Sequence, residues 1–250
     1  MFRPLISLLC SFFLGTNRPG DLEVSPDGTR LYLVLKSQDN RSARVGSGVL
    51  YTYDLTVGLP TSGRTFAFSV PFTQEPFAMD FNKEGEILLV SGAGFAGGDG
   101  SVSVITPSAE LNPQSVLSDD TFRGAFSTGA PFACWIRYSE VNDGCTYVSN
   151  AFRGDSITGF RSQGVGLQLA DADPVAISSP LDLDFSPDEK FLYVLSTGQT
   201  NALIDQVPTI VAYKITADTC GLNEVDTNGD GLPSVSESGS GGGVVGIGVI

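Results

Sequence analysis

The sequence predicts an all-β protein, a β-propeller of about four recognisable blades. The first observation is a plan of apolar strand, turn, apolar strand, loop and strand that occurs four times. The centres of the second strand of each repeat, at Tyr32, Leu88, Tyr147 and Tyr193, are 56, 59 and 46 residues apart. A period of roughly 50 is typical of propeller blades. The second observation is the composition, because 30 Gly and 14 Pro without a long helical period favour short strands and tight turns.

The four blades are expected near residues 20–55, 76–107, 131–163 and 180–216, within a propeller body that covers 16–250. A turn marks the first hairpin of each blade, at residues 25–28, 82–85, 140–144 and 186–188. Pro followed by Asp-Gly, as in 26–28, supplies the fixed φ and the left-handed positions that a tight turn needs. A last apolar strand at 244–250 is expected to pair near the N-terminal repeat and close the ring.

Charge and composition exclude several function classes. The chain has 28 acidic and 14 basic residues, so its net charge of −14 repels a phosphate backbone and an anionic membrane surface. We therefore expect no nucleic-acid partner. The sequence contains no His, which excludes a His-dependent hydrolase or a His-ligated zinc site.

The N-terminus indicates either export or a buried strand. Residues 1–15 place Arg3 before an apolar run of about a dozen residues, which fits a signal peptide and is too short to span a bilayer. The alternatives are a buried strand or a wrongly assigned start. Together with the sequon at Asn40 and the acidic composition, this segment predicts a secreted protein without a membrane span.

The four cysteines lack the paired short spacing of a zinc site. A hairpin turn centred on residues 141–142 would place Tyr138 opposite Cys145 and Cys134 opposite Ser149. That register leaves Cys134 and Cys145 about four residues apart, too far for a disulfide without a bulge or a register shift. Buried free thiols are the preferred prediction.

The tail contains an acidic segment that fits the calcium-loop template. Its oxygen ligands would be Asp226, Asn228, Asp230 and Glu237, with Gly231 at the turn. Against this interpretation, Pro233 interrupts the loop and no amphipathic helix precedes it. The alternative is a polar turn between strands, and apart from calcium no cofactor is expected.

Several motifs resemble one known family. They are Thr-Asn-Arg-Pro-Gly-Asp at 16–21, the Ser-Pro-Asp turns at 25–28 and 186–188, Pro-Phe-Ala-Met at 76–79, Ala-Cys-Trp at 133–135 and Tyr-Val-Ser-Asn at 147–150. With them, residues 16–250 resemble the C-terminal portion of the lactonase or YVTN-type seven-bladed β-propellers, in the carboxymuconate cyclase-like branch. The resemblance implies an enzyme that forms or hydrolyses a lactone on a small polycarboxylate. Its catalytic members use a His that this chain lacks, and a complete member has seven blades.

The loops that enter the inner strands, or join second to third strands, would line the pocket of such a propeller. Arg is a natural holder of carboxylates because its guanidinium pairs with them in a bidentate way. A carboxylic acid can move the proton. The candidate catalytic residues are therefore Glu75, Arg123 and Arg153, and the candidate substrate-binding residues are Asn150, Asp155 and Gln199.

Two functions stay open at the level of sequence. One is the lactonase-like enzyme just described, and the other is a non-catalytic secreted propeller that serves as a binding or surface protein, with these charges simply solvated. Four blades from a seven-bladed plan also leave strand edges at both ends, so we expect a truncated gene product, a tightened four-bladed ring or self-association through those edges.

Overall fold

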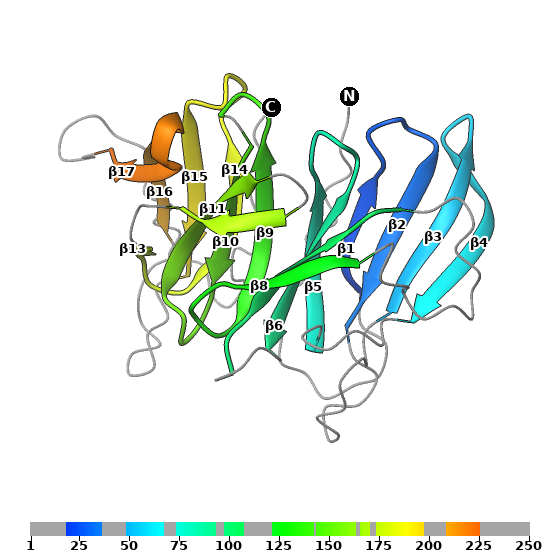
Figure 1. The fold of residues 1–250 in the computed structure, drawn as a ribbon, viewed down its shortest axis with the longest axis horizontal. Coiled ribbons are helices and arrows are strands. Elements are labelled where there is room, and N and C mark those ends of the chain that lie inside the picture. The colour runs from blue at the N-terminus through cyan, green and yellow to red at the C-terminus, as the bar shows by residue number, and fades with distance from the viewer. Residues whose placement is uncertain are drawn as a thin grey trace, which may run out of the picture.

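The computed structural model is built almost entirely from β-strands. It describes residues 19–36, 49–67, 74–93, 98–107, 122–142, 144–163, 166–170, 174–197 and 209–225. These residues form four antiparallel sheets and one short 3₁₀ helix, η1 (Ala217–Thr219). The sheets follow one another across the molecule from blue and cyan on the right to yellow and orange on the left (Figure 1). The prediction of an all-β fold with propeller-type sheets is confirmed.

Each sheet has its strands in simple up-and-down order, with the first strand innermost, and is here called a blade. Blade 1 contains β1 (Pro19–Val24), β2 (Arg30–Leu35), β3 (Val49–Thr56) and β4 (Leu59–Ala67). Blade 2 contains β5 (Gln74–Phe81), β6 (Ile87–Ala93), β7 (Ser101–Ile105) and β8 (Phe122–Ser127). Blade 3 contains β9 (Ala133–Ser139), β10 (Cys145–Asn150), β11 (Ser156–Gln163) and β12 (Gly166–Leu169), and β13 (Val175–Ala176) also pairs with β11. Blade 4 contains β14 (Pro180–Phe185), β15 (Phe191–Ser196), β16 (Thr209–Thr216) and β17 (Gly221–Glu224).

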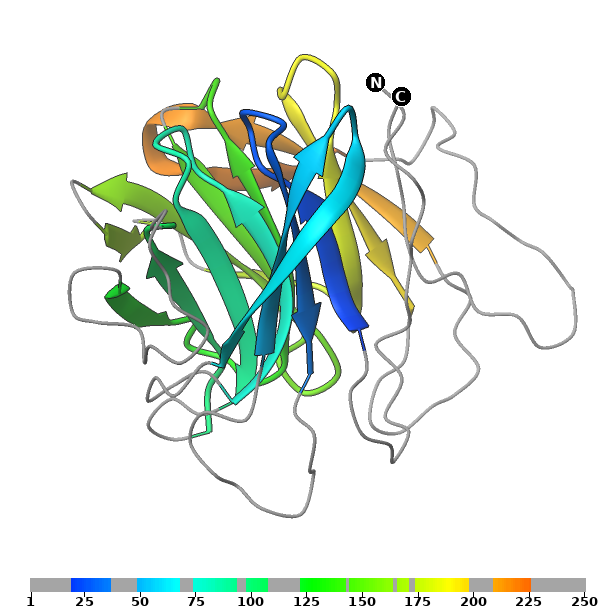
Figure 2. The same ribbon diagram turned by 90° about the vertical axis from the view of Figure 1, so that its right-hand side faces the viewer.

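The outermost strand of each blade lies beyond the three-strand repeat that the sequence pattern predicts. These strands are β4, β8, β12 and β17, and Figure 2 turns β4, in cyan, toward the viewer. Their sequences are short or polar, as in Gly166–Leu169, and carry little apolar alternation. Pairing with a neighbouring strand, rather than an apolar pattern of their own, therefore decides that they are strands.

The inner strands of neighbouring blades lie side by side. β5 contacts β1, β9 contacts β5 and β14 contacts β9. Each blade has a front face, toward the preceding blade in the chain, and a back face, toward the following one. Tyr32 on the back face of blade 1 meets Phe81 on the front face of blade 2 at 5.4 Å between ring centroids. Tyr147 and Phe185 repeat this edge contact between blades 3 and 4 at 6.0 Å, so apolar packing between faces forms the core.

Every inner strand begins with the same irregularity. A register shift interrupts the pairing of β1, β5, β9 and β14 within their first residues. The residue that leads into the bulge is left-handed in three blades, with φ of 55° at Glu75, 58° at Phe132 and 44° at Ser179. Since unlike side chains adopt the same backbone here, the blade geometry imposes this conformation, and local function does not.

The hairpin of blade 3 corrects the expected register. Ser139 pairs with Cys145 and Trp135 with Ser149, so the placement of Tyr138 opposite Cys145 was wrong by one residue. A five-residue connection, held by Gly144 N–H donating to the Ser139 carbonyl, replaces the expected shorter turn. The bulge that the sequence argument considered does exist, and Cys134 lies in it.

A disulfide joins blades 3 and 4. Cys145 is bonded to Cys220, with Cα atoms 5.5 Å apart and a sequence separation of 75. The prediction of a free thiol at Cys145 was therefore wrong, whereas Cys134 stays outside the disulfide and is buried. Cys134 and Cys145 belong to one hairpin, whereas Cys220 is distant in sequence. Only the packing of blade 4 against blade 3 brings Cys220 close to Cys145.

The remaining predictions about the ends of the chain, the segment 1–15 and the closing strand 244–250, lie outside the described residues. No helix in the described part of the chain is long and apolar enough to cross a membrane.

Candidate functional site

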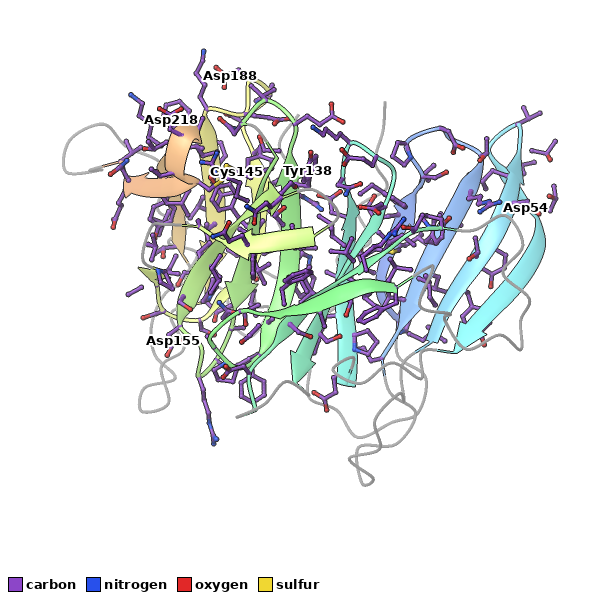
Figure 3. All side chains as sticks on the ribbon, in the orientation of Figure 1. Asp54, Tyr138, Cys145, Asp155, Asp188 and Asp218 are labelled. Carbon is purple, nitrogen blue, oxygen red and sulfur yellow. A yellow bond between two sulfur atoms is a disulfide. The ribbon has the colours of Figure 1, made fainter. Side chains whose placement is uncertain are left out.

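The two ends of the blades carry different connections. The lower end in Figure 1 is where β1, β5, β9 and β14 begin, and the upper end is where they finish. Figure 3 shows Asp155 at the lower end, and Tyr138 and Asp188 at the upper end. The loops predicted to line a pocket open at the lower end.

Arg153 lies at the lower end, in the connection between β10 and β11, and is exposed. Within the described part of the chain, no hydrogen bond or ion pair engages its guanidinium. A second cation at this end is differently placed, because the Lys36 ammonium lies 4.0 Å from the centroid of the Phe77 ring. Arg153 is therefore a cation presented to solvent, with no ion-pair partner among the described residues.

Asp155 holds the loop of blade 3 to the start of blade 4. Its Oδ1 accepts a hydrogen bond from Ser179 N–H at 2.8 Å, and its carbonyl accepts one from Ile177 N–H at 3.0 Å. Ser179 Oγ in turn accepts a bond from Phe152 N–H at 3.2 Å. Asp155 therefore has a structural role. Together these bonds fix the backbone on both sides of Arg153.

Asn150 is buried within blade 3 and does not reach the surface at the lower end. Its Nδ2 donates to Ser156 Oγ at 3.1 Å and to Thr158 Oγ1 at 2.9 Å. Thr158 Oγ1 then donates to the Thr128 carbonyl at 2.8 Å, which links blade 3 to the strand connection before it. The Oδ1 atom of Asn150 is buried and has no hydrogen-bond partner. Asn150 thus forms a bridge inside the blade, and its contact with a substrate stays a prediction.

Arg123 lies at the opposite end from Arg153, which corrects its predicted location. It belongs to the start of β8, after the connection from β7, and not to a loop that enters an inner strand. Its Nε lies 3.7 Å from Glu86 Oε1 and donates to Thr106 Oγ1 at 3.1 Å. The structure therefore does not bring Arg123 together with Glu75 and Arg153.

Glu75 is the second residue of β5, at the lower end, and is partly buried. Its left-handed φ recurs at Phe132 and Ser179, so the backbone strain there belongs to the repeat. Gln199 and the four predicted calcium ligands, Asp226, Asn228, Asp230 and Glu237, lie outside the described residues. Among the residues that are described, no group of three or more Cys, Asp or Glu side chains is placed to hold a metal ion.

A charged cluster that sequence reasoning missed lies between the inner strands. Each blade contributes one residue from the last part of its inner strand: Glu23, Asp80, Arg137 and Asp184. We call these four residues the axial cluster. Arg137 Nε lies 3.3 Å from Asp184 Oδ1, and its Nη1 lies 3.7 Å from Glu23 Oε1, so one side chain joins blades 1, 3 and 4. The recurrence of a charge at this position in all four repeats was the signal that could have revealed it.

Burial and charge oppose each other at Arg137. Its side chain is 15% exposed, and burial by itself disfavours the charged form. The carboxylates of Asp80, Asp184 and Glu23 outweigh burial and hold the pKa of Arg137 above its ordinary value. Arg137 is therefore a permanent cation committed to its acidic neighbours, which suits it to hold blades together.

Two carboxylates also join neighbouring inner strands directly. Asp21 Oδ2 accepts a hydrogen bond from Met79 N–H at 3.0 Å, and Asp80 Oδ2 accepts one from Tyr138 N–H at 2.9 Å. In both residues Oδ1 accepts the N–H of the next residue in the chain, Leu22 or Phe81. Asp at these positions thus hydrogen-bonds one inner strand to the inner strand of the next blade.

Comparisons with known proteins support the fold. No protein-family model matches this chain, and no curated protein matches it. Among solved structures, it is similar to a protein from Lactobacillus plantarum with a TM-score of 0.60 and 19% identity, covering 84% of this chain and 54% of that one. It is also similar to a functionally unknown protein from Desulfotomaculum acetoxidans DSM 771, with a TM-score of 0.57 and 17% identity, covering 83% and 55%. A putative 6-phosphogluconolactonase from Bacteroides uniformis ATCC 8492 matches at a TM-score of 0.48 and 15% identity, covering 81% and 69%.

The first two structures carry the comparison, because their TM-scores are the higher ones. At these identities the likeness shows the fold alone. This chain spans about half the length of both proteins.

Proposed function

We propose that this chain is a lactonase-like propeller that binds a lactone or small carboxylate at its lower end, with Arg153 as the contact for the carboxylate. The observation that carries the proposal is which of the described arginines already have a hydrogen-bond or ion-pair partner in the protein. Arg123 faces Glu86, Arg137 faces two carboxylates, and Arg161 donates to the carbonyl of Ala217 at 3.2 Å. Arg153 is exposed and has no such partner in the described part of the chain.

A guanidinium can bind a ligand well only if it is not already paired with a protein carboxylate. A guanidinium forms paired hydrogen bonds with a carboxylate, and a ligand gains most from a guanidinium that it does not have to separate from a protein anion. The backbone on both sides of Arg153 is fixed through Asp155 and Ser179, so the side chain projects from an ordered support. The same bonds occupy Asp155, and Asn150 is buried, so the geometry favours binding over chemistry.

A second candidate function is lactone formation or hydrolysis at the same end. Glu75 favours it, because it is the second residue of β5, at the end that also presents Arg153. A carboxylic acid in a partly buried position can act as the proton-transfer group without a His. The sequence resemblance to lactonase-type propellers supports the same reading.

The test is binding of a panel of lactones and carboxymuconates by isothermal titration calorimetry, with Arg153→Ala compared with Arg123→Ala. Both variants lose one exposed arginine and the same charge, but Arg123 lies at the opposite end. We expect Arg153→Ala to weaken binding roughly 10- to 100-fold, the value of one charge-assisted contact, and Arg123→Ala to leave it unchanged. Equal weakening by both variants would show that net charge, and not a site at Arg153, governs binding.

Turnover of the same panel separates the two functions. Product formation that is lost in Glu75→Gln, while that variant still binds the ligand, would establish the enzyme. Binding without product, from protein with an intact melting transition, would establish the scaffold.

We also propose that the protein works in an oxidising compartment. The disulfide between Cys145 and Cys220 supports this, because structural disulfides persist mainly in secreted proteins. Expression in a eukaryotic host should yield oxidised protein in the medium. Accumulation in the lysate with both cysteines reduced would contradict it.

A further inference from the structure

The front face of blade 1 is partly exposed at positions that are buried in every other blade. Leu33 occupies the place that Leu89, Val148 and Val194 occupy in blades 2 to 4. Those three side chains are 0% exposed, whereas Leu33 is partly exposed. This face is therefore more exposed than its counterparts in blades 2 to 4.

The same contrast holds across the rest of this face. Leu22 is partly exposed, while its counterparts Met79, Ile136 and Leu183 are fully buried. Val24 is 47% exposed, while its counterpart Phe81 is buried against Tyr32. Together with Leu31, Tyr51 and Tyr53, these side chains make an apolar sheet face without a charged residue.

The repeat shows what kind of surface covers such a face. In blade 2 the front-face residues Met79 and Leu89 form one core with Tyr32, Val34 and Leu50, which belong to the back face of blade 1. The cover is thus the back face of another blade, with a large side chain such as Tyr32 at its centre. A second copy of this chain offers a back face of this kind on blade 4.

The back face of blade 4 is incompletely covered at matching positions. Tyr193 takes the place of Tyr32 and Tyr147, and Ile210 takes the place of Leu50. Both are partly exposed, although all three counterparts are buried. Leu195 and Ala212, between them, are already buried, so Tyr193 and Ile210 are the contact points that this face still offers.

We propose that the front face of blade 1 docks on the back face of blade 4 of a second copy, head to tail. The contact repeats the packing between blades, with Tyr193 of one copy against Val24 of the other, as Tyr32 lies against Phe81. Two four-bladed copies make an eight-bladed ring, within the range of known propellers.

Charge predicts how this association depends on salt. The net charge of −14 makes two copies repel each other at long range, while the described side chains on the front face of blade 1 carry no charge. Screening the repulsion leaves the apolar contact intact, so the association strengthens between low and moderate ionic strength. A contact made by salt bridges would show the opposite trend.

The first test is the mass of the full chain by light scattering over a range of concentrations. We expect a species of twice the 26.2 kDa chain mass, favoured by salt. Val24→Asp and Tyr193→Asp should each yield the single-chain mass, because an unpaired charge is costly in an apolar contact. Val57→Asp is the matched control, since Val57 is 97% exposed in a turn of the same blade, and it should associate like the original protein. Circular dichroism and melting show that each variant is folded.

The second test traps the contact directly. Val24→Cys and Tyr193→Cys proteins are mixed under mild oxidation, and the expected product is a crosslinked pair that forms in the mixture and in neither variant alone. Crosslinking of Val24→Cys with itself would overturn the proposal in favour of two blade-1 faces in contact. The proposal also fails if the original protein has the single-chain mass at every concentration, or if Tyr193→Asp associates normally.

Discussion

Replacement of Arg137 by Met should destabilise the protein more than the loss of any other arginine in the described part of the chain. The substitution keeps an unbranched apolar side chain in place of the aliphatic part of arginine, but leaves Glu23, Asp80 and Asp184 without their cation. At an effective dielectric constant of about 20, the contact at 3.3 Å is worth about 5 kcal/mol and the contact at 3.7 Å about 4.5 kcal/mol before desolvation. The cost of burying the charges offsets much of this, so the free energy of unfolding should fall by about 3–5 kcal/mol.

The loss in free energy of unfolding caused by Arg137→Met should depend on pH. Each proton taken up by the cluster relieves repulsion between carboxylates that now lack a cation, so the folded variant binds more protons than the unfolded chain. Stability therefore rises as the pH falls wherever this holds. The difference from the original protein should be largest near pH 7 and smaller near pH 5.

Urea denaturation followed by tryptophan fluorescence measures these quantities. The chain has one tryptophan, Trp135, which is buried beside the axial cluster on β9. Arg30→Met is the control, because Arg30 lies 3.9 Å from Asp54, whose side chain is 48% exposed, and should cost less than about 1 kcal/mol. If Arg137→Met costs no more than Arg30→Met, or if its deficit grows at pH 5, the axial cluster does not hold the blades together.

Three further predictions concern other contacts between and within blades. Cys220→Ser should lower the free energy of unfolding by about 2–4 kcal/mol, because the disulfide closes a long loop, and a reducing agent should destabilise the original protein equally but leave the variant unchanged in denaturant titration. Gly20→Ala should lower the melting temperature by several degrees, because a Cβ there would lie 2.2 Å from the Phe77 carbonyl oxygen; an unchanged melting temperature would show that blades 1 and 2 can separate at that point. Asp188 should titrate at about 2 in an NMR experiment, since hydrogen bonds from Lys190 and Ser186 lower its pKa. Its stabilising effect is then present above the ordinary pKa near 4 and lost as the pH falls through about 2. A midpoint near 4 would mean that the turn is open in solution.

The candidate site was predictable only in part, and the residues show why. Arg153 and Asp155 share a loop, so their placement at one end follows from the strand order alone. Asn150 precedes the same loop, but only the packing within blade 3 turns it inward toward Ser156 and Thr158. Arg123 follows a long connection between β7 and β8, and sequence could not tell at which end of the blade that connection lies.

The amino-acid sequence by itself determined the repeat, the strands with apolar alternation and the turns between them, because these depend on residues close together in the chain. The Ser25 hydroxyl, for example, bonds to Asp27 and closes its turn from within four residues. Contacts between blades were decided by the tertiary structure alone: the disulfide between Cys145 and Cys220, and the bonds of Arg137 to residues on two other blades. They join residues tens of positions apart, and which distant residues meet depends on how the sheets stack, a property that local propensity and turn chemistry do not encode.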